Sequence, residues 1–322
     1  MRRILLTDFH CPGDTLEDTA AVHELRLSHP DIRVCVRTTA QELWEHNPEV
    51  EEFDEHDGRG LVERIPIQMP LIHRSNQAGL HVIDCIRRYL EDRLQVKISP
   101  LERKATIYLT DEERECGAWL EANGIHGTFW LVNAGHKSDY PVKYWGLENF
   151  QKVIDLTRHA IQWVQVGATE HTHRPLKGVI DMVGKTTHRQ LAALTHHADG
   201  VLTGVSYLMH MATIRWYGHG QTRRPVVVIN GGREPDTFSA YPGQHRFSSV
   251  GLLDCCRNGG CWRSTVTGSD AKSCAHPAKL PGGETVPLCM AMIRPEAVAE
   301  RILAIVESFR AATPAPAAGT TP

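Results

Sequence analysis

The first residues that could take part in chemistry lie between a predicted strand at 3–7 and a predicted helix at 16–27. The loop between them reads Pro-Gly-Asp-Thr-Leu over residues 12–16. Open α/β sheets bind ligands outside the carboxyl ends of their strands, and Gly13 would let the backbone approach a ligand closely. The alternative is that Asp14 only caps the helix, as aspartates often do.

Two lysines mark a second candidate loop. An apolar segment at 128–133 predicts a buried strand, and it leads into residues 134–145, which end at the start of a predicted helix. Lys137 and Lys143 lie in this loop. Lysines and free helix amides together offset the charge of a diphosphate. The alternative is a solvated loop with incidental lysines.

Polar turns follow two further predicted strands. Glu170 comes after the strand at 161–166 and could accept hydrogen bonds from a ribose. A Gly-x-Ser turn, Gly204 and Ser206, begins another predicted helix, and His210 lies one turn along it. A histidine on a helix can be purely structural, so both interpretations of His210 stay open.

Arg233 follows a Val-rich predicted strand at 225–230. This position would let its guanidinium meet an anion at the strand's carboxyl end. The alternative is that Arg233 only pairs with the neighbouring Glu234.

Five cysteines fall within the segment 241–290, which lacks the apolar periodicity of a core. Four thiolates can bind zinc or iron in a closed tetrahedral site that orders such a segment, and this would make the metal structural. The spacing is not that of a standard zinc finger, and disulfides or free thiols are the alternatives. The predicted ligands are Cys256, Cys261, Cys274 and Cys289, with Cys255 as a replacement for Cys256.

The elements that must position these residues form two successive βαβ series with a boundary near 123–127. They predict two α/β, Rossmann-like domains that face each other, at 1–125 and 126–310, followed by a disordered tail at 311–322. Strands are expected at 3–7, 32–37, 128–133, 161–166, 200–202 and 225–230, and helices at 16–27, 81–96, 110–122, 147–157, 188–197, 206–216 and 295–309.

Composition narrows the possible partners. The 322 residues carry 35 basic and 38 acidic side chains, a net charge of -3, which offers no field for a nucleic acid or an anionic membrane. No segment approaches the ~20 apolar residues of a membrane span, and the N-terminus lacks a secretory apolar core. Scattered cysteines indicate a reducing, cytoplasmic setting. The acidic stretch at 51–57 is expected to be a solvated loop.

In their order along the chain, the motifs resemble glycosyltransferase family 9, the ADP-heptose:lipopolysaccharide heptosyltransferases. The resemblance extends from Arg3 to about Glu307. It implies an inverting GT-B enzyme with two Rossmann-like domains, an interdomain cleft and no catalytic metal. The residues that carry it are Gly13-Asp14-x-Leu16 with Thr19-x-Ala21, Asn47-Pro48, Lys143-x-Trp145, Val166-Gly167 with Glu170, and Ser206-x-x-Met209-His210-x-Ala212.

The resemblance also implies roles. Asp14 would be the catalytic base, Lys143 a diphosphate contact, Glu170 a ribose ligand and the segment Ser206–His210 a phosphate site. One departure concerns the sugar, because the family usually has Asp-Ser-Gly where this chain has Val205-Ser206-Tyr207. Autotransporter heptosyltransferases, a similar branch, carry a cysteine-bound iron finger, so iron and zinc are both expected candidates.

The sequence therefore predicts transfer of a sugar, expected to be heptose, from ADP-heptose to a hydroxyl of a glycan, a protein or a small molecule. The alternative is a non-catalytic nucleotide-sugar-binding protein with a degenerate transferase site. A metal-centred redox or nucleic-acid protein built on the cysteines is a further rival, which the charge balance disfavours. An oligomer is compatible with the sequence.

Overall fold

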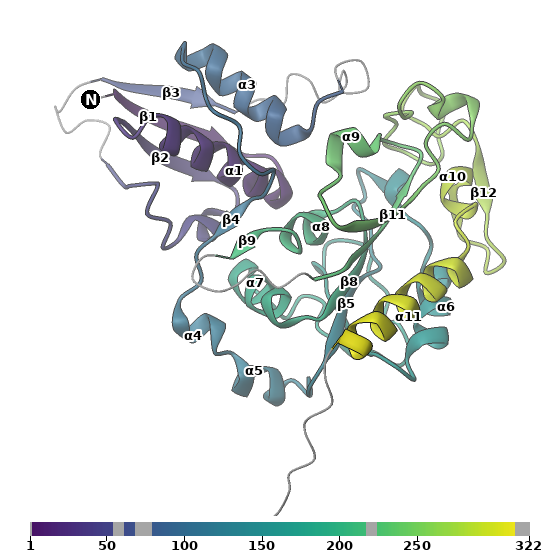
Figure 1. Cartoon of the computed structure of the whole chain (residues 1–322). Helices are drawn as coiled ribbons and strands as arrows, with labels where there is room; N and C mark the ends of the chain where they lie inside the picture. Colours follow the sequence, from purple (N-terminus) through teal and green to yellow (C-terminus); the bar gives the residue numbers. More distant parts are fainter. Residues whose placement is uncertain (1, 54–60, 68–78, 217–223, 313–322) are drawn as a thin grey trace, which may run out of the picture.

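The computed structural model describes residues 2–53, 61–67, 79–216 and 224–312 (Figure 1). Part of the acidic stretch at 51–57 and nearly all of the tail at 311–322 lie outside the described residues, so the predictions made for them are not tested.

The first part of the chain forms a three-stranded parallel sheet with the strand order β2-β1-β3. The strands are β1 (Arg2–Asp8), β2 (Ile32–Thr38) and β3 (Val62–Pro66). Helices α1 (Pro12–Ser28) and α3 (Val82–Leu94) pack against each other beside it (Figure 1). Apolar side chains of the sheet and of both helices share one buried cluster, which fixes α1 and the loop before it.

The second part of the chain forms a six-stranded sheet in the order β11-β10-β8-β5-β6-β7. All its pairings are parallel. The order reverses at β5, since the chain continues to β6 on one side and returns to β8 on the other. The strands are β5 (Phe129–Asn133), β6 (Gln162–Gln165), β7 (Ile180–Asp181), β8 (Gly200–Gly204), β10 (Val226–Gly231) and β11 (Gln244–Ser248).

Helices cover both faces of this sheet, because alternate side chains of its strands enter different cores. Helices α6 (Leu147–Thr157) and α11 (Pro295–Ala312) pack together on the face that contains Trp130 and Val132. Helix α7 (His188–His197) lies on the opposite face, and there Leu191 and Leu194 share a cluster with Phe129 and Leu131 of β5. The predicted bounds of α6 and α7 are confirmed.

A short parallel pair, β4 (Thr106–Ile107) and β9 (Arg215–Trp216), joins a segment that follows the first sheet to one that belongs with the second. The helix expected at 110–122 is two helices, α4 (Asp111–Arg114) and α5 (Gly117–Ala122). The helix expected at 206–216 ends early as α8 (Tyr207–Met211), and its last two residues form β9. The division into domains at 1–125 and 126–310 stays a prediction.

The segment 241–290 contains more regular structure than expected. Its first part is β11, which the sequence analysis missed. A cysteine-rich stretch follows, with a short antiparallel pair and two helical turns. After α9 (Asp236–Ser239) and β11, the elements are η3 (Asp254–Cys256), β12 (Pro277–Lys279), β13 (Thr285–Pro287) and α10 (Leu288–Ala291); the remaining 3₁₀ helices are η1 (Gln41–Trp44) and η2 (Pro141–Lys143).

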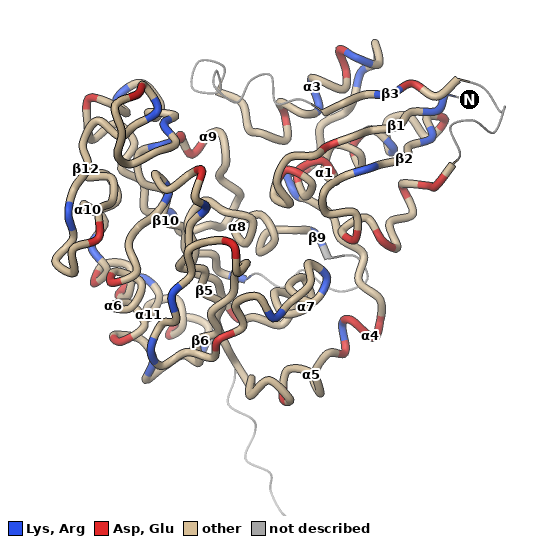
Figure 2. Tube along the Cα trace, turned by 180° about the vertical axis from the view of Figure 1, so that it is seen from behind, with Lys and Arg blue, Asp and Glu red and all other residues tan. Residues whose placement is uncertain are grey.

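Charged residues of both signs are interspersed along the trace around both sheets (Figure 2). Among the described residues, no helix combines the length and the apolar character needed to cross a membrane.

Candidate functional site

The candidate loops lie at the carboxyl ends of β1, β5 and β8, and those of β5 and β8 flank the point where the strand order reverses. Ligands of open α/β sheets bind at such a point. The loop after β1 reaches the same place, because helices α1 and α8 are in contact. A Cβ added to Gly13 would lie 3.6 Å from Cδ2 of His210 and 3.7 Å from the Cα of Tyr207. The structure therefore brings Gly13 next to the Ser206–His210 segment.

Asp14 is the third residue of α1, whose N-cap is Cys11, and its carboxylate takes part in capping the helix. One carboxylate oxygen, Oδ2, accepts a hydrogen bond of 2.9 Å from the backbone N–H of Cys11. Burial raises the pKa of Asp14, the Cys11 N–H opposes this shift, and the nearby charge of Asp8 adds to it. A carboxylate with a raised pKa is a stronger proton acceptor. The cap occupies only one of its oxygens, so capping and base catalysis are compatible.

Lys137 contacts the loop before α1, whereas Lys143 contacts Glu234. The Nζ of Lys137 lies 2.9 Å from the Sγ of Cys11 and 3.3 Å from a carboxylate oxygen of Asp139. The Nζ of Lys143 lies 3.1 Å from Oε2 of Glu234. Burial lowers the pKa of Lys143, and Glu234 is the largest opposing influence. Lys137 thus reaches the loop that leads to Asp14, and the charge of Lys143 also acts to lower the pKa of Asp14.

Arg233 is buried and makes its contacts within the protein. It pairs with Glu234, donates from Nε to the backbone oxygen of Arg263 at 2.9 Å, and lies 5.0 Å from the ring centre of Tyr140 and 5.5 Å from that of Trp262. The alternative interpretation, pairing with Glu234, is what the structure shows. Burial would raise the pKa of Glu234, but Lys143 and Arg233 outweigh it and hold this pKa at about 2.

Glu170 lies in the exposed turn after β6. A backbone hydrogen bond lowers its pKa, so this carboxylate is ionised at neutral pH. None of the contacts described for Glu170 involves Asp14 or Lys143. Glu170 therefore belongs to the same site only if one ligand is long enough to contact all three residues.

His173, which the sequence analysis missed, lies over two of the predicted turns. A Cβ on Gly135 would come within 2.3 Å of the imidazole, and one on Gly167 within 2.1 Å. Both ring nitrogens are buried and have no hydrogen-bond partner among the described residues. Burial, followed by His171 and His136, lowers the pKa of His173 to about 4. The sequence feature that could have indicated His173 is a His-x-His motif, which directly follows Gly-x-x-Glu at residues 167–170.

His210 belongs to a buried polar network that crosses between the two parts of the chain. Its Nδ1 lies 2.7 Å from the hydroxyl of Tyr241 and 3.2 Å from Oε1 of Glu17, and neither partner was predicted. Burial and then Lys143 lower the pKa of His210 to about 3. Burial raises the pKa of Glu17 well above its usual value. Ser206 is the N-cap residue before α8, and its Oγ lies 2.7 Å from the hydroxyl of Thr203 in β8.

The cysteines of the 241–290 segment approach one another without forming a metal site. A Cβ on Gly232 would lie 3.2 Å from the Sγ of Cys256 and 3.3 Å from that of Cys289. Burial raises the pKa of Cys289 to about 12, and the thiols of Cys261, Cys274 and Cys256 add to the shift. Within the described ranges, no group of three or more His, Cys, Asp or Glu side chains is arranged to hold a metal ion. The predicted tetrathiolate geometry is therefore not present.

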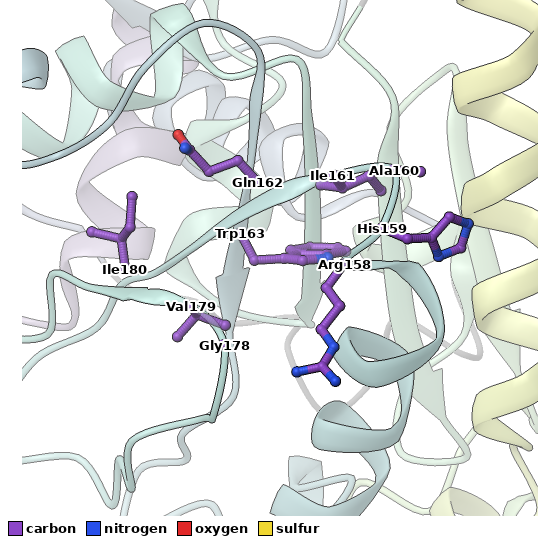
Figure 3. A pocket seen from close by; sticks show the side chains of 9 residues that line it. All are labelled: Arg158, His159, Ala160, Ile161, Gln162, Trp163, Gly178, Val179 and Ile180. Carbon is purple, nitrogen blue, oxygen red and sulfur yellow. The ribbon is translucent and has the colours of Figure 1, made fainter.

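A surface cavity of about 560 Å³ lies elsewhere (Figure 3). Its walls are residues 158–163 and 178–180, at the amino ends of β6 and β7. None of the predicted site residues lines it. It lies at the edge of the sheet opposite to the one where open α/β sheets bind ligands, so we do not assign the site to it.

The fold was compared with known proteins. No protein-family model and no curated protein sequence matches this chain significantly. Solved structures do match. A glycosyltransferase of family 9 from Veillonella parvula DSM 2008 is 16% identical, with a TM-score of 0.63 over 95% of this chain and 97% of that one. The E. coli ADP-heptose LPS heptosyltransferase II is 14% identical, with a TM-score of 0.58 over 96% and 100%.

A third similar structure is the iron-containing dodecameric glycosyltransferase TibC from enterotoxigenic E. coli H10407. It is 16% identical, with a TM-score of 0.61 over 96% of this chain and 77% of that one. At such identities the likeness shows the fold. The resemblance inferred from the motifs is thus confirmed at the level of the fold, and this chain has the mixed α/β architecture with parallel sheets seen in family 9 glycosyltransferases.

Proposed function

We propose that this protein is an inverting glycosyltransferase of the GT-B type that transfers a sugar, expected to be heptose, from ADP-heptose to an acceptor hydroxyl. The observation that carries the proposal is the convergence of Asp14, Lys143 and the Gly204–His210 segment at the strand-order reversal of the second sheet. One of the similar structures is named an ADP-heptose LPS heptosyltransferase, and another structure of TibC is described as a heptosyltransferase in complex with ADP-D-β-D-heptose; both names support the choice of donor.

In this proposal residues 1–125 bind the acceptor and residues 126–310 bind the donor. Lys143 and Lys137 offset the charge of the diphosphate, and the Gly204–Ser206 turn lies beside it. A Cβ on Gly204 would be 3.6 Å from the backbone oxygen of Lys143, so the two donor loops are close to each other. Glu170 hydrogen-bonds the ribose hydroxyls from the turn after β6.

The chemical step needs a base, a leaving group and alignment. Asp14 takes the proton from the acceptor hydroxyl while the acceptor oxygen bonds to the anomeric carbon. The bond from that carbon to the diphosphate breaks on the opposite face, which inverts the configuration. Lys143 stabilises the charge that develops on the diphosphate. General-base help of this kind contributes about 10²–10⁴-fold, and preorganised positive charge lowers the barrier further.

Replacing Asp14 by Asn tests the mechanism. The Asn side-chain oxygen can still accept from the Cys11 N–H, so the helix cap is kept while the base is lost. We expect turnover of ADP-heptose to fall by about 10²–10⁴-fold with unchanged donor affinity in calorimetry. Asp155→Asn on the exposed side of α6 is the matched control. Near-normal turnover of Asp14→Asn would contradict the mechanism, and equal or tighter binding of a UDP-sugar would contradict the donor.

One observation favours a second function, a non-catalytic nucleotide-sugar-binding protein. Val205, which stands where the family has a carboxylate, is buried in the apolar cluster of the second sheet and cannot replace a sugar contact. A protein of this kind binds ADP-sugars but neither transfers nor hydrolyses them. Slow hydrolysis of an ADP-sugar by the wild type, lost in Asp14→Asn, would exclude it.

The thiols of the described cysteines are not arranged to hold a metal ion in this structure, so we also propose that a structural zinc or iron ion would draw together Cys256, Cys261, Cys274 and Cys289, with Cys255 as the replacement for Cys256. The proximity of Cys256 and Cys289 at Gly232 and the mutual influence of the thiols support it, and one similar structure is described as iron-containing. Elemental analysis under reducing conditions should find about one metal per chain, decreased in Cys261→Ser. No stoichiometric metal, with all five thiols freely titratable, would contradict the proposal.

A further inference from the structure

The imidazole of His210 is held at one edge by side chains from both parts of the chain. Its Nδ1 lies 2.7 Å from the hydroxyl of Tyr241, which comes before β11, and 3.2 Å from Oε1 of Glu17 in α1. Both partners are buried. Two buried polar groups that meet at one ring nitrogen hold the ring in one orientation.

The ring of Tyr241 is itself fixed between two histidines. Its centre lies 5.6 Å from that of the His210 ring and 5.0 Å from that of the His81 ring, and the planes meet at 87° and 73°. Edge-to-face arrangements of this kind are favoured between aromatic rings. His81 is the N-cap residue of α3, where its Nδ1 accepts a hydrogen bond from the Ile83 N–H. Packing from both parts of the chain therefore directs the Tyr241 hydroxyl at His210.

This hydrogen bond determines which nitrogen of His210 carries the hydrogen. Within the described residues, the hydrogen-bond partner found for the Tyr241 hydroxyl is Nδ1 of His210. A buried hydroxyl hydrogen without an acceptor is costly, so Tyr241 donates and Nδ1 accepts. Burial and then Lys143 lower the pKa of His210 to about 3, so the ring is neutral and has one N–H. That hydrogen is therefore on Nε2.

Glu17 fits this arrangement as a neutral acid. Burial, followed by the charge of Asp14, raises the pKa of Glu17 well above its usual value. An ionised carboxylate at 3.2 Å would instead favour a hydrogen on Nδ1 of His210. Glu17 lies one turn after Asp14 on α1, so the two side chains share one side of the helix. The helix that carries the proposed base therefore also contacts the ring of His210.

The other edge of the His210 ring faces the proposed site. A Cβ added to Gly13 would lie 3.6 Å from Cδ2, the ring atom bonded to Nε2. The side chain of His210 is 12% exposed, and within the described residues no hydrogen-bond partner is found for Nε2. The ring thus presents its N–H beside the turn that leads to Asp14.

We propose that Tyr241 and Glu17 are positioning residues that hold His210 with its Nε2–H directed at the diphosphate of the donor. The inference rests on the proposed function. When the bond between the anomeric carbon and the diphosphate oxygen breaks, the electron pair stays on that oxygen. His210 hydrogen-bonds the diphosphate and keeps its proton, while the proton of the acceptor hydroxyl goes to Asp14. Because Glu17 belongs to α1, it ties the position of this donor to the helix that begins with the base.

Conservative substitutions separate positioning from simple packing. Tyr241→Phe keeps the ring between the two histidines but removes the hydrogen that Nδ1 accepts. Glu17→Gln keeps the shape and neutrality of the side chain, whereas Glu17→Leu removes its polar atoms. Thr157→Val is the matched control, because it removes a buried hydroxyl that accepts from Nε1 of Trp163 at 3.0 Å at the end of α6. That hydroxyl lies on the side of the second sheet where β6 begins, away from the proposed site.

The position of the ring hydrogen is tested by ¹⁵N NMR of protein labelled at histidine. Subtracting the spectrum of His210→Gln isolates this ring among the 19 histidines. In the wild type we expect Nδ1 to show the chemical shift of a nitrogen without hydrogen and Nε2 that of an N–H. Tyr241→Phe should populate both tautomers. A hydrogen on Nδ1 in the wild type would overturn the inference.

Kinetics measure the consequence for turnover of ADP-heptose. We expect Tyr241→Phe to lower kcat on the order of 10-fold, as for one hydrogen bond lost in the transition state, with little change in KM. Glu17→Leu should lower kcat in the same direction, and Glu17→Gln should keep most of the wild-type rate. Thr157→Val should retain the wild-type kcat although its melting temperature falls.

Normal kcat in Tyr241→Phe, or a Glu17→Gln variant as slow as Glu17→Leu, would overturn the positioning role and leave the proposed function standing. A wild type that neither transfers from nor hydrolyses any ADP-sugar would overturn both proposals together.

Discussion

Replacing Arg189 by Met should weaken the contact between the two parts of the chain. Arg189 lies on α7, and its buried guanidinium pairs with Glu113 of α4. It also donates to the backbone oxygen of Glu42 in η1 at 3.0 Å and to that of Tyr108 at 2.9 Å. One side chain thus joins a helix of the second sheet to three segments that precede that sheet. Met has a similar length but cannot donate.

The size of the effect follows from what the substitution leaves behind. Two part-buried backbone oxygens lose a donor, and leaving such an acceptor unsatisfied costs at most about 1–3 kcal/mol. Glu113 is 25% exposed, so water recovers part of its interaction. We therefore expect a loss of about 2–4 kcal/mol in the free energy of unfolding, at or below the ~3–5 kcal/mol for breaking a fully buried pair.

Urea unfolding at neutral pH measures this change. The midpoint should decrease with an unchanged m-value, because the surface exposed on unfolding stays the same. Arg257→Met is the matched control, since its pair with Asp254 is 71% and 81% exposed and should contribute less than about 1 kcal/mol. If Arg189→Met changes stability no more than this control does, the contact does not hold the two parts together.

The pH dependence checks the same contact. Burial alone would raise the pKa of Glu113, but Arg189 and the Thr110 backbone outweigh it and lower this pKa. A carboxyl with a lowered pKa in the folded state stabilises the protein above its unfolded pKa of about 4.5. The difference between the wild type and Arg189→Met should therefore shrink as the pH falls below that value.

Two further predictions concern the fold. Gly146→Ala should destabilise the protein by about 1–3 kcal/mol, because φ is +99° and an added Cβ would lie 2.3 Å from the Leu280 side chain. Gly124→Ala is the control for backbone strain alone, because φ is +74° but no atom lies within 4 Å of the added Cβ. Thermal melting of both variants measures the difference. Burial lowers the pKa values of His81 and His173 to about 4. Because the unfolded imidazoles bind protons near pH 6.5, stability should fall as the pH drops from 6.5 toward 4. The melting temperature of His173→Gln should fall less steeply over that range, and an equally steep fall would contradict the assignment.

Local patterns predicted the elements that carry strong signals. Thr187 and Gln190 form a capping box at the start of α7, so both periodicity and the cap indicated where it begins. The edge strand β11, Gln-His-Arg-Phe-Ser, was missed because only one residue of its sequence is apolar. The helix expected at 110–122 breaks at Glu115–Cys116, where the backbone departs from helical geometry although the residue types permit a helix.

For the candidate site, the sequence predicted the loops but not their partners. Asp14, Lys143 and His210 were found because each lies where a predicted strand ends or a helix begins. Glu17 and Tyr241, which contact His210, come from α1 and from a segment near β11, and no local pattern relates positions so far apart. Arg233 was predicted as an anion contact because it follows a strand. Its position in the sequence did not reveal that its guanidinium lies near the rings of Tyr140 and Trp262 and pairs with Glu234.

The short β4–β9 pair has a mechanical consequence. Its hydrogen bonds run between backbone groups of Thr106–Ile107 and Arg215–Trp216, so they resist sliding and separation far more than rotation about the strands. An opening of the molecule that breaks the Arg189 and His210 contacts but leaves this pair intact would rotate about the pair. Groups near the pair move little, whereas groups farther from it travel through an arc. The distance between the loop after β1 and the loops after β5 and β8 would then depend on a single angle.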